Sequence, residues 1–234
     1  MKKLSLVAII VLALPVTSQA LHLKVPNQLT VCSYSEFKPI SYGNGEGFEA
    51  QLVNKIAKQL KVKVKYYPEA IYEQLWAMPS KPYTLCDIAI GGFSKTAARE
   101  QQGAVFSKPS LRFSQSFLIR RQDADQLNQV TKFANHKIGV VPGTTGALYA
   151  IQRLKEAGLD WQTIIVNYPS EHELVPALKQ QKIDAIGRGE IGNEYQAKQD
   201  SQFKTVLKRD FGESFRIVVD KNNPELLELI NQQL

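Results

Sequence analysis

A short polar segment that follows a buried strand contains side chains able to bind an anion. The apolar run 88–90 ends at the glycine pair Gly91-Gly92, where the backbone can approach a ligand closely. Three polar residues follow within one turn-rich segment: Ser94, Thr96 and Arg99. The planar guanidinium of Arg99 can clamp a carboxylate with two parallel hydrogen bonds. The segment therefore predicts a carboxylate site; the alternative is a surface arginine after an ordinary strand.

A glycine-threonine loop further along the chain offers an anion site of another kind. The strand predicted over 138–141 ends at Pro142-Gly143, and a helix with apolar positions at helical spacing begins after Thr144 and Thr145. Free amides and the positive end of a helix dipole attract a carboxylate. Such a turn by itself often connects a strand to a helix without binding any ligand. Together with Arg99, it predicts a second wall of an anion pocket.

The spacing of the first segment resembles that of the family 3 periplasmic solute-binding proteins, the polar amino-acid receptors of ABC importers. In that family an aspartate is followed by glycine at +5, threonine at +9 and arginine at +12, and four residues fit: Asp87, Gly92, Thr96 and Arg99. Shorter resemblances cover 47–52, 106–109 and 140–146, with departures at Ala50, Gln51 and Ser110. The resemblance implies that Arg99 clamps the ligand carboxylate, with these residues beside it: Gly92, Ser94, Thr144 and Thr145.

Three aromatic residues lie where such receptors sandwich the ligand side chain. Tyr34, Phe37 and Tyr72 come just beyond the ends of predicted strands. Aromatic residues usually belong to a core, but Tyr34 and Phe37 flank a loop of polar residues and proline. The resemblance therefore implies a pocket position for all three, whereas Trp76 is expected to pack inside.

One departure from the family pattern concerns the ligand's ammonium group. Relatives that bind an α-ammonium usually place an aspartate five residues after the position of Asp184, and here that residue is Gly189. Arg188 precedes it and Glu190 follows it. Either Glu190 substitutes for the aspartate through a loop shift, which we favour, or the ligand lacks this contact and Arg188 meets an anionic group.

The elements that would position these residues form two similar units. Apolar periodicity predicts a strand at 29–32, a helix at 48–60, a strand at 62–66, a helix at 71–78 and a strand into Gly92. A second unit has strands at 117–119, 138–141, 163–166 and 183–186, with helices from Leu148 and around 174–178. A strand at 215–219 and a helix from Pro224 end the chain.

This order predicts an α/β fold of two Rossmann-like lobes. In the family the terminal strand-helix pair returns to the first lobe, so the resemblance implies a two-stranded hinge. We expect lobe one to span 21–111 plus 213–234 and lobe two to span 112–212.

The N-terminus predicts export. Lys2 and Lys3 precede the apolar run 4–14, and Ser18-Gln19-Ala20 supplies the small residues of a cleavage site. Removal of this signal peptide, residues 1–20, leaves 214 residues and lowers the net charge from +7 to +5. The basic residues are scattered, so nucleic-acid binding has little support.

The two cysteines could pair in an oxidising compartment. Cys32 lies late in the first strand, and Cys86 comes just before a neighbouring parallel strand. Level strand starts would separate them by roughly 10 Å along the strands. Bridged Cα atoms are rarely more than about 7 Å apart, which argues against a disulfide.

The residues and the resemblance together imply a periplasmic, monomeric receptor that closes around an amino acid or related small carboxylate. It would pass this ligand to an ABC permease, with no cofactor or metal. The alternatives are an enzyme similar to periplasmic cyclohexadienyl dehydratase, with Glu190 as a general acid, and a metabolite sensor. Three histidines, His22, His136 and His172, show no catalytic or metal-binding spacing.

Overall fold

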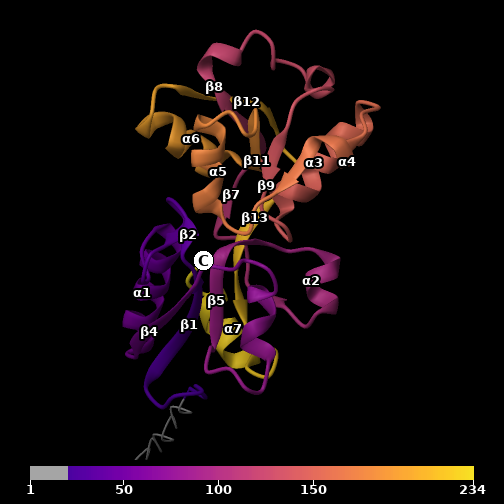
Figure 1. The fold of residues 1–234 in the computed structure, drawn as a ribbon. Helices are drawn as coiled ribbons and strands as arrows, with labels where there is room; N and C mark the ends of the chain where they lie inside the picture. The colour runs from indigo at the N-terminus through magenta and orange to yellow at the C-terminus, as the bar shows by residue number, and fades with distance from the viewer. Residues whose placement is uncertain (1–20) are drawn as a thin grey trace, which may run out of the picture.

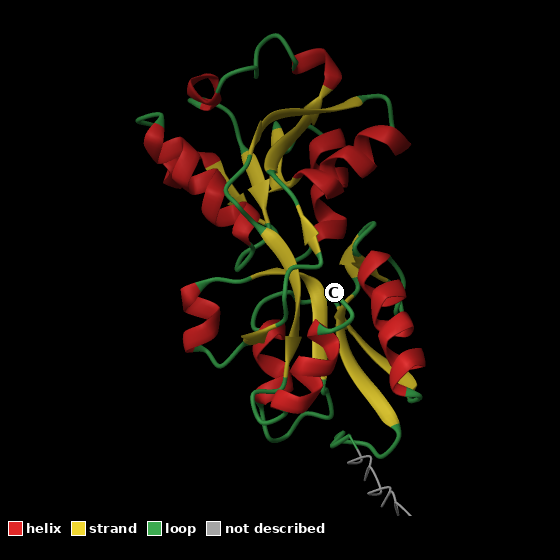
Figure 2. Ribbon diagram, turned by 180° about the vertical axis from the view of Figure 1, so that it is seen from behind, coloured by secondary structure: helices red, strands yellow, loops and turns green. Residues whose placement is uncertain are grey.

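The computed structural model describes residues 21–234, and the predicted signal peptide lies outside the described residues. Two sheets, each covered by helices on both faces, form two α/β lobes (Figures 1 and 2). The prediction of two Rossmann-like lobes joined by a hinge is confirmed. No helix within 21–234 combines the length and apolarity that a membrane crossing requires.

Lobe one is built on a sheet of order β4-β1-β5-β13-β6, in which β4, β1 and β5 are parallel and β13 is antiparallel to β5. Its strands are β1 (Gln28–Tyr34), β4 (Lys63–Glu69), β5 (Ile88–Ser94), β6 (Val105–Phe106), β7 (Leu111–Arg112) and β13 (Ser214–Val219). A small hairpin, β2 (Glu36–Phe37) and β3 (Ser41–Tyr42), follows β1. The helical segments are α1 (Phe48–Leu60), η1 (Leu75–Ser80), α2 (Ala97–Gln101) and α7 (Pro224–Asn231).

Lobe two is built on a sheet of order β10-β9-β11-β8-β12, in which β8 is antiparallel to both of its neighbours. Its strands are β8 (Gln115–Arg120), β9 (Ile138–Val140), β10 (Ile165–Asn167), β11 (Ala185–Gly189) and β12 (Phe203–Arg209). Its helical segments are η2 (Arg121–Asp123), η3 (Val130–Phe133), α3 (Thr145–Glu156), α4 (Trp161–Ile164), α5 (Glu171–Lys179) and α6 (Glu190–Gln199).

Each central strand supplies both faces of its sheet because successive side chains alternate. In β1, Leu29 and Val31 pack with α1 and α7, whereas Cys32 and Tyr34 pack on the opposite face with the η1 segment. In β8, Phe117 faces the α3 side and Leu118 faces α5. Both faces are apolar, as expected for strands covered on two sides.

The hinge is a pair of antiparallel strands between the lobes. β7 pairs with the start of β13, with Arg112 opposite Ser214 and Leu111 opposite Phe215. Figure 1 shows β7 and β13 running between the two halves of the molecule. The lobe boundary predicted at 111/112 lies within β7 and the one at 212/213 lies just before β13; both boundaries stay predictions.

Several predicted elements differ in detail, and others, among them β12 and α6, were not predicted. The helix expected over 71–78 is the short 3-10 helix η1, since Gln74 has a left-handed backbone and Pro79 lies inside the turn. The strand expected over 163–166 begins later, because Asp160 caps the short helix α4. Strand β12 alternates only weakly, and α6 is polar almost all round, so neither has a clear periodic pattern.

The expectation of unpaired cysteines is wrong, because Cys32 and Cys86 form a disulfide with Cα atoms 5.5 Å apart. The predicted offset between the two strands is correct, since Cys32 lies opposite Ala89, and Ala89 is three residues after Cys86. The chain does not run straight before β5, however. It bends at Asp87, whose backbone N–H donates to the Thr30 carbonyl at 2.9 Å, and this bend turns Cys86 back over Cys32.

Candidate functional site

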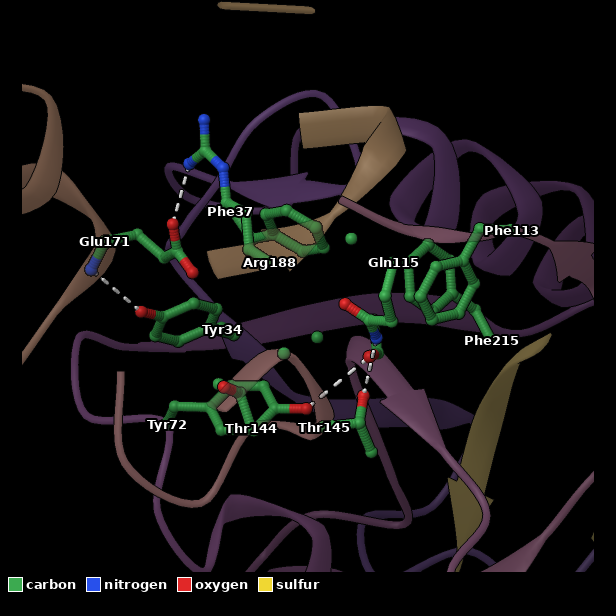
Figure 3. A pocket seen from close by; sticks show the side chains of 14 residues that line it. Tyr34, Phe37, Tyr72, Phe113, Gln115, Thr144, Thr145, Glu171, Arg188 and Phe215 are labelled. Atoms are coloured by element: carbon green, nitrogen blue, oxygen red, sulfur yellow. Dashed lines mark hydrogen bonds and ion pairs between the residues drawn. The ribbon is translucent and has the colours of Figure 1, made fainter. Parts of the chain in front are cut away.

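A pocket lies between the lobes. The residues that line it come from lobe one, from lobe two and from the segments that cross between them (Figure 3). They are Tyr34, Phe37, Tyr72, Gly91, Gly92, Phe113, Gln115, Thr144, Thr145, Gly146, Glu171, Arg188, Gly189 and Phe215. The carboxyl ends of β1, β5 and β11 all open onto it, as expected for ligand sites in parallel α/β sheets.

Most of the residues that the sequence singles out line this pocket. Those that do are Tyr34, Phe37, Tyr72, Gly92, Thr144, Thr145 and Arg188. Three others, Ser94, Arg99 and Glu190, lie outside the lining. The lining residues that sequence reasoning missed include Phe113, Gln115, Glu171 and Phe215. Which of these side chains contact a ligand stays a prediction.

Aromatic rings form the walls of the pocket. Tyr34 and Tyr72 meet edge to face with ring centroids 5.1 Å apart, and Phe113 stacks on Phe215 at 4.1 Å. Phe37 meets the edge of Phe215 at 6.0 Å. Burial raises the pKa of both tyrosines, so their hydroxyls stay protonated. These walls suit an apolar or planar ligand side chain.

Gly92 has a backbone conformation and a close contact that favour glycine. Its φ is +67°, and a Cβ atom would lie 2.9 Å from the ring of Phe37. The bare backbone at the end of β5 therefore lets Phe37 pack against it. A larger residue here would push this ring into the pocket.

The guanidinium of Arg99 lies directly behind the pocket wall. Arg99 is 3% exposed, and its Nη1 donates to the Ser94 carbonyl at 2.7 Å. Its Nη2 donates to the Tyr72 hydroxyl at 3.1 Å and, across the lobes, to the Gly143 carbonyl at 2.8 Å. The guanidinium carbon also lies 4.5 Å from the ring centroid of Trp76. Arg99 therefore links the two lobes at the edge of the pocket.

The start of α3 faces the pocket as the sequence predicts. Thr144 is the N-cap, and its Oγ1 accepts the backbone N–H of Ala147 at 3.1 Å. Thr145 Oγ1 accepts a 3.3 Å hydrogen bond from Gln115 Nε2. A Cβ on Gly146 would lie 2.7 Å from Arg188 Cα, so glycine allows this helix to approach β11. The free amides at the helix start give the pocket a positive edge.

Arg188 is neutralised by a partner that the sequence did not reveal. Its Nη1 lies 2.7 Å from Glu171 Oε2, and both residues are buried. Its other donors reach Asn193 Oδ1 at 2.7 Å and the Gly192 carbonyl at 3.0 Å. Glu171 is the first residue of α5, where an acid ordinarily serves only to stabilise a helix start. Its sequence position therefore gave no functional signal.

Glu190 points away from the pocket. Its Oε1 accepts the backbone N–H of Ser114 at 3.2 Å, and its Oε2 pairs with Lys208 at 3.2 Å. The space in front of Gly189 is filled by Phe113, whose ring would lie 3.2 Å from a Cβ at that position. An aromatic ring thus stands beside the position at which the family resemblance leads us to expect an aspartate.

A fully buried acid supports the pocket from beneath. Glu49 Oε2 accepts the backbone N–H groups of Gly91 and Gly92 at 2.8 and 2.9 Å. Its Oε1 has no partner among the described residues. Burial raises the pKa of Glu49 to about 7, and the two backbone hydrogen bonds oppose this rise. Glu49 therefore holds the glycine pair in place and titrates near neutral pH.

We expect Glu49 to make the free energy of unfolding fall as pH rises. A carboxyl whose pKa is higher when folded stabilises fully below the unfolded value of about 4.5 and loses this effect as pH passes about 7. Between pH 5 and 7.5 the loss is about 2 kcal/mol. Urea unfolding of Glu49→Gln should show this part of the pH dependence removed. The exposed control Glu100→Gln should keep the wild-type slope, and an unchanged slope in Glu49→Gln would contradict the assignment.

Within residues 21–234, no group of three or more histidine, cysteine, aspartate or glutamate side chains could hold a metal ion. The pocket instead combines aromatic walls with two polar ends. Figure 3 shows Glu171 and Arg188 at one end and Gln115, beside Phe113 and Phe215, at the other. The arrangement suits the binding of a small molecule with a polar group at each end.

Comparisons with known proteins find relatives over most of the chain. The amino-acid-binding protein AabA of Dichelobacter nodosus is 27% identical over 210 residues, which are 86% of this chain and 79% of AabA. An ancestral arginine-binding protein bound to arginine is 26% identical with a TM-score of 0.77, covering 88% of this chain and 90% of that one. The arginine-bound, truncated ArgBP from T. maritima has the same fold, with a TM-score of 0.74 at 23% identity over 88% of this chain and 94% of its own.

The family model agrees with these relatives and with the two-lobed fold. The model of the bacterial extracellular solute-binding proteins, family 3, matches residues 29–234. This match covers both lobes, the hinge and every residue that lines the pocket. The chain therefore belongs to the bacterial extracellular solute-binding proteins of family 3.

Proposed function

We propose that this protein is the periplasmic receptor of an ABC importer and that it closes its lobes around an amino acid or a related small carboxylate. The observation that carries this proposal is a pocket whose wall is shared by both lobes and the hinge. A ligand that contacts both lobes stabilises the closed form relative to the open one. The names of AabA and of the ancestral arginine-binding protein support an amino acid as the ligand.

The sequence supports the rest of the transport proposal. The predicted signal peptide would direct the chain to the periplasm, with cleavage after Ala20. The mature protein would act as a monomer and present its closed form to a permease in the inner membrane. No cofactor is needed for this cycle, because the binding energy alone drives closure.

We assign the ligand carboxylate to the side of the pocket between Arg99 and the start of α3. Arg99 Nη2 now donates to Tyr72 and Gly143, which both adjoin the pocket lining. A carboxylate is a stronger acceptor than a carbonyl, so it would replace Gly143 as the partner of Arg99. The backbone amides near Thr144 and Thr145 would bind its second oxygen. Tyr34, Phe37 and Tyr72 would then pack around the ligand side chain.

Binding should close the lobes without chemical change to the ligand. Calorimetry of the ligand-stripped protein against the common L-amino acids would first identify a binder. Small-angle scattering should then show a smaller radius of gyration with that amino acid than without it. An amino acid that calorimetry shows not to bind is the control and should leave the radius unchanged.

Mass spectrometry of the bound amino acid separates a receptor from a dehydratase-like enzyme. A receptor returns the amino acid unchanged after prolonged incubation. Product accumulating beyond one equivalent of protein would contradict the receptor proposal. Loss of uptake of the labelled amino acid in cells that lack this protein would distinguish transport from sensing alone.

A further inference from the structure

Buried oxygen atoms that lack a hydrogen-bond partner lie beside the pocket, near the hinge. Within the described part of the chain, Ser94 Oγ, Gln115 Oε1 and Glu213 Oε1 are all buried and all without a partner. Their residues are 2%, 3% and 7% exposed. Buried polar atoms are normally paired, so three unpaired oxygens near one another need an explanation.

The contacts between these residues place them together. Gln115 Nε2 donates to Glu213 Oε2 at 2.6 Å, although the two residues are 98 positions apart. Ser94 lies opposite Phe215 in the pairing of β5 with β13, two residues beyond Glu213. Ser94 and Glu213 also line one shared groove beside the pocket. Ser94 and Glu213 therefore lie beside the hinge end of the pocket, and Gln115, which contacts Glu213, belongs to the pocket lining.

Among residues 21–234, no cation forms an ion pair with Glu213. One carboxylate oxygen accepts a hydrogen bond from the neutral Gln115, and the other has no partner. A buried carboxylate with so little compensation is unfavourable. A positively charged donor is the group that would stabilise it. An ammonium group has three N–H donors and could donate one to each unpaired oxygen.

The other acids near the pocket have more donors than Glu213: Glu49 Oε2 accepts two backbone N–H groups, although its Oε1 has no partner among the described residues. Glu171 is paired with Arg188 at 2.7 Å, and Glu190 is held by Ser114 and Lys208. Phe113 fills the space in front of Gly189. Glu213 is thus the acid whose charge is least compensated at this end of the pocket.

The neighbouring anion site supports the same assignment. An α-amino acid carries its ammonium and carboxylate on one carbon, so their binding sites must adjoin. Gln115 Nε2 lies 3.3 Å from Thr145 Oγ1 at the start of α3, on the side assigned above to the carboxylate. Figure 3 shows Gln115 and Thr145 joined at this end of the pocket, away from Glu171 and Arg188.

We propose that Glu213, together with Gln115 and Ser94, binds the ammonium group of the ligand in place of the aspartate that this chain lacks. This proposal rests on the proposed function, since it assumes an amino-acid ligand. It also implies that the ligand side chain extends toward Glu171 and Arg188. The acid that binds the α-ammonium would thus lie just before the hinge strand β13 rather than in lobe two, which would contribute Gln115.

Glu213→Gln tests the assignment because it removes the charge and keeps the shape. Calorimetry against the amino acid that the wild type binds most tightly should show a loss of at least about 100-fold. The deaminated analogue of the same amino acid, such as 5-guanidinopentanoate for arginine, should bind wild type and variant within about threefold, since it has no ammonium to lose. The control Glu194→Gln makes the same change on a partly exposed side chain of α6, which pairs with Lys208, and should match the wild type.

Two outcomes would overturn the proposal. Glu213→Gln could bind the amino acid within about threefold of wild type, or Glu190→Gln could show the large loss instead. Circular dichroism and the urea midpoint check that each variant folds. If Glu213→Gln does not fold, Glu213→Asp is the second variant, because it keeps the charge but moves it away from the ammonium site. It should still lower the affinity for the amino acid more than the affinity for the deaminated analogue.

A different set of results would show that the proposed function itself is wrong. If the wild type binds none of the amino acids, simple amines such as putrescine and ethylamine become the probes. Amine binding that Glu213→Gln abolishes would support the ammonium site while contradicting an amino-acid receptor. Absence of amine binding as well would overturn both proposals.

Discussion

Replacement of Arg99 by alanine is expected to weaken ligand binding by two to three orders of magnitude. Arg99 is 3% exposed and stacked 4.5 Å from the centroid of Trp76, so its charge is held in a largely dry environment. Removing one partner of a buried charge pair costs about 3–5 kcal/mol. At about 1.4 kcal/mol per tenfold change, this corresponds to the expected loss. Calorimetry with the identified amino acid measures it directly.

A ligand without a carboxylate distinguishes two roles of Arg99: binding the ligand carboxylate, or only linking the two lobes. If Arg99 binds the carboxylate, the carboxamide of the same amino acid should bind wild type and Arg99→Ala with similar affinities. If Arg99 acts only through Gly143, both ligands should lose affinity equally in the variant. Arg99→Lys keeps the charge but not the planar fork of the guanidinium. Its affinity for the amino acid should therefore lie between those of the wild type and Arg99→Ala. Binding of the amino acid by Arg99→Ala within a few-fold of wild type would rule out the clamp.

Removal of the Cys32–Cys86 disulfide is expected to lower the free energy of unfolding by about 4 kcal/mol. The bridge joins residues 54 positions apart, and a cross-link of that span restricts the unfolded chain strongly. It also ties β1 to the segment that leads into β5, the two strands whose ends carry Tyr34 and Gly92. Urea unfolding of the double variant Cys32→Ser/Cys86→Ser, compared with the oxidised wild type, measures the loss.

Reduction provides a matched control for the same bond. Dithiothreitol should lower the urea midpoint of the wild type and leave that of the double variant unchanged. A Trp161→Phe background makes the remaining tryptophan, Trp76, report on lobe one, where the disulfide lies. A loss below about 1 kcal/mol would show that the bridge contributes little to the stability of this lobe.

The sequence by itself determined the family resemblance and the elements with strong local patterns. The helix predicted at 48–60 and the strand predicted into Gly92 match α1 and β5 closely, because apolar periodicity and the glycine pair are local signals. Positions at the ends of parallel strands also follow from element order. Together with the family resemblance, this is why Tyr34, Gly92 and Thr144 could be assigned to one pocket before the lobes were seen together.

Only the tertiary structure decided how charges and thiols are paired. A bend at Asp87 brings Cys86 to Cys32, and strand register alone gives no sign of that bend. Glu171 neutralises Arg188, and Glu213 meets Gln115 from 98 positions away in the sequence. Such contacts depend on how the two crossings of the hinge and the start of α5 pack in space. Sequence periodicity reports which face of an element is buried, whereas the partner of a buried charge is fixed by the packing of elements far apart in the chain.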